Sequence, residues 1–371
     1  MITYPLQSIT LEQAMELQFK VVDCITREFP GHEILTRGDL GVVPGLNKPV
    51  TTMKAEKVIA RVFDAEAAML VRGAGTDAIA DALYAVVKPG QTLLVHTSPI
   101  YSTTQTTIDR QGIKTVAADF NDPDSIRTVM SQNPQIRAAL VQYTRQSMTD
   151  RYDMEQVISV IKSCRDIPIV TDDNHAVMKV AKNGTQCGAD LACFSTFKLQ
   201  GPEGIGCIVG KQEYIDFLVK LNYSGGSQTQ GHEALEVLRG LVYAPVSLAI
   251  QAQVNDRLVQ RLNAGEIGGI KDAFLANAQS KVLLVEFDRP IAQQVLVEAE
   301  KLGAAPNPIG AESRYELSPM FYRVSGTFRA TDPTITQRMI RINPMRCGDD
   351  TVIRILREAM ERVISCSRNN L

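Results

Sequence analysis

Short apolar runs alternate with amphipathic stretches along the first two thirds of the chain. Strands are predicted for the runs AAMLVR, TLLVH, IKTVAAD, RAALVQY, IPIVTDD, LACFST and GIGCIVG, and helices for most of the segments between them. Apolar runs separated by helices are typical of a mostly parallel sheet that helices cover on both faces. The pattern therefore predicts an α/β fold, in which ligands bind outside the carboxyl ends of the strands.

The N-terminal region lacks this alternation. Residues Leu11 to Phe29 have the apolar spacing of a helix, and a second helix is predicted from Lys54 to Phe63. Between them lies the turn-prone stretch RGDLGVVPGLNKPV at 37–50. We expect this stretch to run over the surface or to reach into a partner.

The pattern changes again from His232, where a long helix is predicted. The segments after it are shorter and mixed, which indicates a smaller α+β domain. The length of 371 residues is enough for two domains, since a domain has roughly 150 residues. We predict an N-terminal segment at 1–50, a large domain at 51–245 and a small C-terminal domain at 246–371.

Composition narrows the class of function. The chain has 39 Lys and Arg against 41 Asp and Glu, so it lacks the basic surface that nucleic-acid binding needs. No uncharged apolar run in the sequence approaches the roughly 20 residues of a membrane span. The seven cysteines form no Cys-x-x-Cys pair, which argues against a zinc site or a disulfide framework. We expect a cytoplasmic protein without a metal, a membrane partner or a nucleic-acid partner.

Glycines mark the first candidate site, RGAGTDAI, between a predicted strand and a predicted helix. Gly73 and Gly75 let the backbone approach a ligand closely, and the free amides of a helix N-terminus attract an anion. With Ala78 in the third position, the same letters fit a dinucleotide fingerprint. That alternative, a nicotinamide-dependent oxidoreductase, needs an acid near the end of the next strand, and residues 91–98 contain none.

Two later strand ends also carry polar residues. The run IPIVTDDNHA ends in Asp172 and Asp173, and adjacent carboxylates are unfavourable in a buried sheet unless one of them meets a cation. In LACFSTFKLQGPEGIG, Ser195 and Lys198 stand where an apolar strand stops, and glycines follow. The glycines indicate a backbone that wraps closely around a group beside the lysine.

Together, the glycine turn, the acid and the lysine resemble the pyridoxal-phosphate enzymes of fold type I, the aspartate aminotransferase superfamily. The resemblance implies pyridoxal 5'-phosphate as the cofactor, bound to Lys198 as a Schiff base. It also implies that Asp172 bonds the pyridinium nitrogen and that Gly75, Thr76 and Ser195 bind the phosphate. If the register of the acids is shifted by one, Asp173 takes the place of Asp172.

Three shorter motifs refine the resemblance. DDNHA is similar to the Asp-Glu-Ala-His pattern of the oxoamine synthases, which gives His175 the ring hydroxyl; Asn174 stands where that pattern has a small residue. SPIYSTT is similar to the Tyr-Gly-Gly-Thr of the trans-sulfuration lyases, so Tyr101 is the candidate for stacking on the ring, with His96 second. KLQGPEGIG is similar to the run after the lysine in selenocysteine synthases, and the chain as a whole resembles the bacterial YhfS group.

The reaction implied by the resemblance starts from a small amino acid or amine. Arg341, in MIRINP, is similar to the small-domain arginine that clamps a substrate carboxylate, and Arg346 and Arg145 are alternatives. An aminotransferase is the first expectation, and a lyase that catalyses β-elimination or replacement is the alternative. A cofactor-binding regulator without catalysis is a third possibility, but no DNA-binding segment or basic patch precedes residue 50.

The resemblance finally implies a second subunit. The segment GGSQTQG, with Ser227 and Gln228, lies where relatives send a loop to the phosphate of the partner subunit. The stretch from Arg37 to Pro49 occupies a similar place near the N-terminus. We therefore expect a homodimer, or a higher homo-oligomer, in which two chains complete each site.

Overall fold

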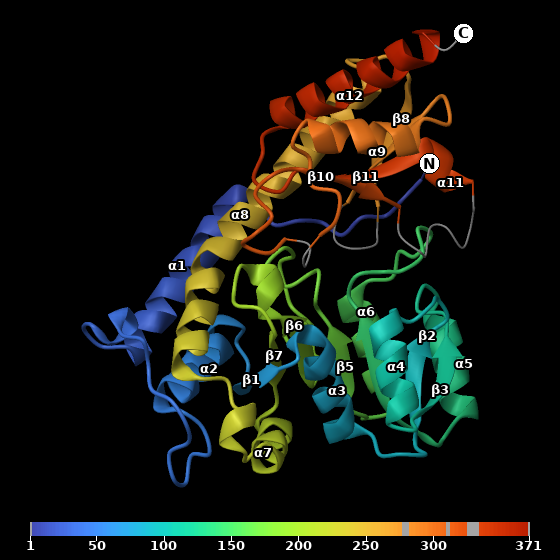
Figure 1. The fold of residues 1–371 in the computed structure, drawn as a ribbon. Coiled ribbons are helices and arrows are strands. Elements are labelled where there is room, and N and C mark those ends of the chain that lie inside the picture. The colour runs from blue at the N-terminus through green and yellow to red at the C-terminus, as the bar shows by residue number, and fades with distance from the viewer. Residues whose placement is uncertain (1, 277–281, 309–311, 325–333, 370–371) are drawn as a thin grey trace. The chain divides into compact units, whose positions relative to one another are not determined.

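The computed structural model describes residues 2–276, 282–308, 312–324 and 334–369 (Figure 1). The chain divides into two compact units. The large unit is Ile9–Gln146 and Asp150–Val246, and the small unit is Met1–Ser8, Ser147–Thr149 and Ser247–Leu371. Most of the predicted N-terminal segment is thus part of the large unit.

The large unit is built on a seven-stranded sheet with the order β1-β7-β6-β5-β4-β2-β3. Its strands are β1 (Ala67–Arg72), β2 (Thr92–His96), β3 (Lys114–Ala118), β4 (Ile136–Gln142), β5 (Ile169–Asp172), β6 (Leu191–Ser195) and β7 (Ile205–Gly210). All pairs are parallel except those of β7, which is antiparallel to β1 and β6. The structure confirms the predicted mostly parallel sheet.

Helices cover both faces of this sheet (Figure 1). They are α1 (Leu11–Glu28), α2 (Val50–Val62), α3 (Ala74–Val86), α4 (Ser102–Arg110), α5 (Pro123–Gln132), α6 (Met154–Cys164), α7 (Gln212–Leu221) and the first part of α8 (Gly231–Asn263), with the 3₁₀ turns η1 (Glu33–Leu35), η2 (Thr196–Leu199) and η3 (Gly225–Ser227). Along β2, Leu93 and Val95 pack with α3 and α7, whereas Leu94 packs with α5 and α6. This alternation follows from the two-residue period of a strand.

Side-chain caps set where several helices begin. Thr10 and Gln13 form a reciprocal capping box at the start of α1, with bonds of 3.2 and 2.9 Å. The cap of α2 comes from farther away, because the Asp39 carboxylate accepts from the amides of Val50 at 2.7 Å and Thr51 at 2.9 Å. α2 therefore begins four residues before the start that its apolar spacing predicts.

The small unit contains a four-stranded antiparallel sheet with the order β10-β11-β9-β8. Its elements are β8 (Ile270–Leu275), β9 (Leu283–Phe287), α9 (Ala292–Lys301), β10 (Met320–Arg323), α11 (Ile335–Arg338), β11 (Met339–Asn343) and α12 (Asp349–Asn369). The end of α8, α9 and α12 pack with this sheet around a core that includes Leu258, Val285 and Leu356. The structure confirms the predicted smaller α+β domain.

α8 contributes to both units, and the division after Val246 lies next to Pro245 inside the helix. The segment Gly225–Asn263 is the one helical stretch of the described residues that is long and apolar enough to cross a membrane. However, 56% of its most apolar window is buried inside the protein. Such burial is typical of the core helix of a soluble protein.

Candidate functional site

Six of the seven strands in the large sheet end at the same edge. Because β7 is antiparallel to both β1 and β6, β1 runs parallel to β2 through β6. The last residues of these strands are Arg72, His96, Ala118, Gln142, Asp172 and Ser195. The predicted anion turn, acid pair and lysine each follow one of these strand ends, so the structure brings them to one edge of the sheet.

Asp172 is buried at the end of β5, with 9% of its surface exposed. Its Oδ1 accepts two hydrogen bonds from Asn174, from the backbone amide at 3.1 Å and from Nδ2 at 2.8 Å. Burial raises the pKa of Asp172, while Asn174, the charge of Lys198 and a hydrogen bond from Gln142 act in the opposite direction. The ionised form of this buried acid thus depends on its immediate neighbours.

Asp173 has a different environment from Asp172. Its Oδ2 accepts from the amide of Gly184 at 2.7 Å. Burial raises the pKa of Asp173 to about 7, and the charge of Asp172 adds to the effect. Of the two acids, Asp172 is therefore the one that Lys198 stabilises as a carboxylate.

Within the described parts of the chain, no three His, Cys, Asp or Glu side chains gather as a metal-ligand set.

Lys198 lies in η2, directly after β6, and is partly buried. The turn around it is fixed by a bond of 2.9 Å from Thr196 Oγ1 to the carbonyl of Ile205 and by another from the amide of Gly201 to the carbonyl of Thr196. A Cβ at Gly201 would lie 2.8 Å from the Thr196 oxygen, so this close turn needs glycine. Because β5 and β6 are parallel neighbours, Lys198 and Asp172 come to adjacent strand ends.

The glycine turn lies between β1 and α3. Gly73 occupies the N-cap of α3 at φ +95°, a conformation that favours glycine. The amides of Gly73 and Ala74 donate to the carbonyl of Gly204 at 2.8 and 3.1 Å, which ties the turn to the loop before β7. Gly73 brings no side chain to this helix start, and the space is taken by the Asp77 carboxylate, whose Oδ2 lies 1.8 Å from where a Cβ at Gly73 would stand. The amides of Gly75 and Thr76 follow in the first turn of α3, where backbone donors have no partner within the helix.

Asn174 connects these segments, which the sequence did not lead us to expect. Its Oδ1 accepts from the amide of Ser195 at 2.9 Å, and its Nδ2 donates to Asp172. A Cβ at Gly75 would lie 2.0 Å from the same Oδ1, so the start of α3 packs directly on this carboxamide. Ser195 is buried, and His175, the next residue after Asn174, is partly buried.

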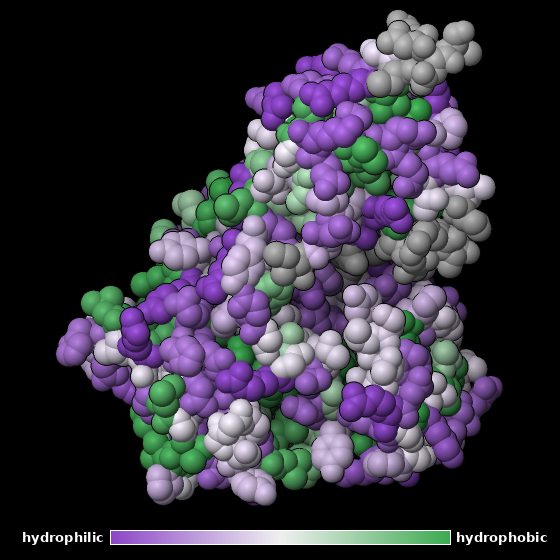
Figure 2. Space-filling view, viewed as in Figure 1, coloured by the Kyte–Doolittle hydropathy of each residue, from purple (hydrophilic) through white to green (hydrophobic). Residues whose placement is uncertain are grey.

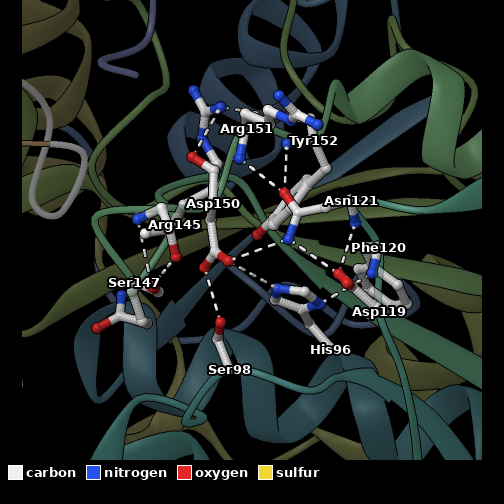
Figure 3. A network of polar contacts seen from close by, with 12 residues as sticks. His96, Ser98, Asp119, Phe120, Asn121, Arg145, Ser147, Asp150, Arg151 and Tyr152 are labelled. Atoms are coloured by element: carbon white, nitrogen blue, oxygen red, sulfur yellow. Dashed lines mark hydrogen bonds and ion pairs between the residues drawn. The ribbon is translucent and has the colours of Figure 1, made fainter. Parts of the chain in front are cut away.

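The two candidates for ring stacking have different surroundings. Figure 3 shows His96, Ser98 and Asn121 converging on Asp150, whose carboxylate bonds to their side chains at 3.2, 2.8 and 3.1 Å. His96 Nδ1 accepts from the amide of Phe120 at 3.0 Å, which places the proton of the neutral ring on Nε2. His96 thus belongs to a network of its own, whereas Tyr101 is 41% exposed at the start of α4.

Arg145 follows β4 and has 6% of its surface exposed. Its guanidinium lies over the ring of Tyr152 at 5.8 Å, and its Nη1 makes long bonds of 3.4 and 3.5 Å to the carbonyls of Tyr152 and Asp150 (Figure 3). Burial lowers its pKa, and neighbouring Tyr152 and Asp150 oppose this effect. Arg145 therefore fills a place in the large unit beside the Asp150 network.

The other two candidate arginines lie in the small unit. Arg341, on β11, is buried and donates from Nη2 to the hydroxyl of Tyr322 at 3.0 Å, with its guanidinium 4.5 Å from the centre of that ring. Arg346 donates to the carbonyl of Ser313 at 3.4 Å, and burial lowers its pKa against the opposing charges of Glu312 and Glu316. Tyr322 thus fixes the orientation of Arg341.

The two segments predicted to reach a partner lie against each other in the large unit. The amide of Gly41 donates to Gln230 Oε1 at 2.7 Å, and the amide of Gly231 donates to the carbonyl of Asp39 at 3.0 Å. Within the same chain, Ser227 Oγ bonds to Asn222 Oδ1 and Gln228 Nε2 bonds to the Asn222 carbonyl. Both predicted cross-subunit donors therefore have partners within one chain.

Apolar side chains are exposed around the N-terminal part of the large unit, and Figure 2 shows green apolar surface over this region. The exposed members are Met15, Phe19, Val22, Leu35, Leu40, Val42 and Val43. They lie on α1 and on the segment that follows it. Exposed apolar surface of this kind is typical of a protein–protein interface.

Two protein-family models, a related protein and its crystal structure all match this chain. The family model for aminotransferase class-V matches residues 49–237, and that for the YhfS-like C-terminal domain matches residues 256–356. YhfS of Escherichia coli (strain K12) is 52% identical over 361 residues, which are 97% of this chain and 99% of that protein. The crystal structure of E. coli YhfS, described as a pyridoxal-5'-phosphate dependent protein, superposes with a TM-score of 0.96 over 98% of this chain and 100% of its own.

More distant solved structures share the fold. A carbon–sulfur lyase involved in aluminum resistance from Clostridium novyi NT has a TM-score of 0.72 at 17% identity, with 95% of this chain and 91% of that chain covered. Cystathionine gamma synthase from Xanthomonas oryzae pv. oryzae has a TM-score of 0.70 at 15% identity, with 94% and 98% covered.

Proposed function

The chain belongs to the aminotransferase class-V family and is 52% identical to YhfS of E. coli, and we propose that it is a pyridoxal-phosphate-dependent enzyme that acts as an aminotransferase on a small amino acid or amine. One observation carries this proposal. The buried Asp172 and the loop lysine Lys198 lie at the ends of neighbouring parallel strands, and the glycine turn lies at the same edge of the sheet.

The phosphate of the cofactor fits the start of α3. The amides of Gly75 and Thr76 stand at the positive end of the helix dipole, and Gly73 has no side chain to occupy them. The hydroxyl of Ser195, at the end of β6, is a further donor for the same group. These three residues are the proposed phosphate site.

The ring of the cofactor fits the residues of the next two strand ends. A buried carboxylate such as Asp172 suits a protonated pyridine nitrogen, because the two opposite charges offset each other's desolvation. Lys198 supplies the primary amine that an aldehyde requires. We assign His175 to the ring hydroxyl and Tyr101 to the face of the ring.

When bound, the cofactor supplies an electron sink for the negative charge that develops at the α-carbon of the substrate. Asp172 holds a proton on the ring nitrogen by remaining ionised. Lys198 Nζ, as the neutral amine, removes the proton from the α-carbon as the general base. Arg341, held by Tyr322, is the proposed clamp for the substrate carboxylate.

A lyase that catalyses β-elimination or replacement is the second candidate. The fold it shares with a carbon–sulfur lyase and a cystathionine synthase favours this alternative. Both reactions use the same proton removal by Lys198 and differ in whether the substrate loses its amino group or its β-substituent.

A panel of amino acids distinguishes the two reactions. The purified protein, which the bound cofactor is expected to colour yellow, is incubated with each amino acid, with and without an oxo acid as the amino acceptor. The products are then identified. An aminotransferase forms a new amino acid only when the oxo acid is present. Release of ammonia and an oxo acid without an acceptor would instead show elimination and overturn the first assignment.

We also propose that the protein is a cytoplasmic homodimer. The exposed apolar residues of α1 and the segment after it support an interface, and the six cysteines whose side chains the structure describes are free thiols, as expected in a reducing compartment. In the dimer, Ser227 and Gln228 would have to exchange their Asn222 bonds for the partner's phosphate. Light scattering at micromolar concentration is expected to give twice the mass of the chain, and a monomer with its full complement of cofactor would contradict the proposal.

A further inference from the structure

Asn174 lies where three separate segments meet at the edge of the large sheet that carries the proposed cofactor site. It follows β5, contacts the amide of Ser195 at the end of β6, and packs against Gly75 at the start of α3. β1 and β6 are not neighbours, because β7 lies between them in the sheet. The carboxamide of Asn174 therefore joins strand ends that the sheet itself does not hold together.

The chemistry at this point requires both a donor and an acceptor. The Asp172 carboxylate can only accept and the Ser195 amide can only donate, so Nδ2 must face Asp172 and Oδ1 must face Ser195. A carboxylate at position 174 would lose the donor and repel Asp172. An apolar side chain of similar size would lose both hydrogen bonds. The short distance to Gly75 leaves little room for a longer side chain.

The two hydrogen bonds from Asn174 to Asp172 end on the same oxygen. The backbone amide and Nδ2 both donate to Oδ1, at 3.1 and 2.8 Å. This pair holds Oδ1 in place, and Gln142 provides a further hydrogen bond to the carboxyl group. Hydrogen bonds to the charged form also favour ionisation of a buried acid.

We propose that Asn174 is a positioning residue for the cofactor site, which orients Asp172 toward the ring nitrogen and fixes its distance from the phosphate-binding residues Gly75 and Ser195. This inference rests on the proposed function of the site and deepens it. Asn174 itself touches neither the substrate nor the reacting atoms. It acts through the hydrogen bonds of its carboxamide.

Two substitutions test whether the hydrogen bonds or the volume of Asn174 matter. Asn174→Leu keeps a similar size without either bond, and Asn174→Asp keeps an acceptor for Ser195 but places a second carboxylate against Asp172. The matched controls are Asn133→Leu and Asn133→Asp, because Asn133 ends α5 before β4, at the opposite edge of the sheet. Thermal unfolding of each variant checks that it is folded.

Two measurements on these variants do not depend on turnover. Equilibrium dialysis against pyridoxal phosphate gives the affinity, and the ¹⁵N signal of ring-labelled cofactor reports whether the ring nitrogen carries its proton. We expect affinity to fall roughly tenfold to a hundredfold, more for Asn174→Asp than for Asn174→Leu, as for a lost hydrogen bond to a charged group. The ring signal is expected to move toward that of the unprotonated pyridine, with both controls unchanged.

The results separate this inference from the proposed function. If Asn174→Leu kept the affinity and the ring signal of the unaltered protein, Asn174 would only fill space and the inference would be wrong. If the unaltered protein bound no pyridoxal phosphate, the proposed function would fail instead. A variant that lost affinity without any change of the ring signal would also contradict the role of Asn174 in orienting Asp172.

Discussion

The two halves of the same sheet edge use their polar residues in different ways. At the ends of β2, β3 and β4, His96, Ser98 and Asn121 all bond to Asp150, and His96 also accepts from a backbone amide. At the ends of β5 and β6, the buried Asp172 instead accepts hydrogen bonds from Asn174, and the charge of Lys198 lowers its pKa against the effect of burial. The first half surrounds its acid with three hydrogen-bonding side chains, whereas the second places a buried acid and a lysine at neighbouring strand ends beside a helix start.

This difference shows why polar residues at strand ends do not all indicate a ligand site. His96 and Asp172 have similar sequence settings, each at the end of an apolar strand. Their hydrogen-bond partners separate them, because those of His96 and Asp150 form a closed network that rigidifies the fold. We therefore expect substitutions in the first half to affect stability and those in the second to affect chemistry.

The largest effect is expected for Asp172→Asn. Without the carboxylate, the ring nitrogen loses its proton and the cofactor becomes a weaker electron sink. Exchange of the substrate α-proton with deuterated water, followed by proton NMR, is expected to slow by about two orders of magnitude or more. Asp173→Asn is the matched control and is expected to have a much smaller effect. If Asp173→Asn slowed the exchange more than Asp172→Asn, the acid that faces the ring nitrogen would be Asp173.

Asp150→Ala tests the first half of the sheet edge, which contains the network around Asp150. It removes the acceptor for three side chains and is expected to lower the free energy of unfolding in urea by about 3 kcal/mol, because buried donors are left unsatisfied. The protein is expected to retain its full complement of cofactor. Asp166→Ala, at an acid whose side chain is 93% exposed, is the control and should leave stability almost unchanged. Loss of cofactor without loss of stability in Asp150→Ala would contradict the division into two halves.

A smaller effect, dependent on pH, is expected for Asp173→Asn. Burial raises the pKa of Asp173 to about 7 from its usual 3.8, so the folded protein holds a proton that the unfolded chain releases. The stability from this group is present at low pH and is lost as the pH rises toward 7. Relative to the unaltered protein, the variant should therefore become more stable between pH 5 and pH 8, by about 2–3 kcal/mol. Urea unfolding at the two pH values measures the change, and a constant difference would show that Asp173 is ionised throughout.

Local patterns in the sequence were enough to predict much of the fold. AAMLVR, TLLVH and MEQVISVIKSC coincide with β1, β2 and α6, because their apolar periods are set by neighbouring residues. The start of α2 was missed since its cap is Asp39, eleven residues before Val50. An interaction of this kind leaves no local signal in the apolar spacing.

The candidate site was predictable to a similar degree. Lys198, Asp172 and the glycine turn follow strand ends, which parallel strands bring to one edge. Asn174 was missed because its role depends on Ser195, 21 residues later, and on the close packing of Gly75. The role of His96 likewise depends on Asp150, 54 residues later. Such partners are decided by the folded arrangement of the loops and not by the spacing of residues along the chain.

Identification of the lysine that binds the cofactor tests the central claim most directly. The yellow protein is reduced with borohydride, digested, and mapped by mass spectrometry for the pyridoxyl group. The account predicts the modification on Lys198 and its absence in Lys198→Ala, while Lys182→Ala, at an exposed lysine paired with Glu155, keeps it. A pyridoxyl group on another lysine of the unaltered protein would contradict the assignment of this site.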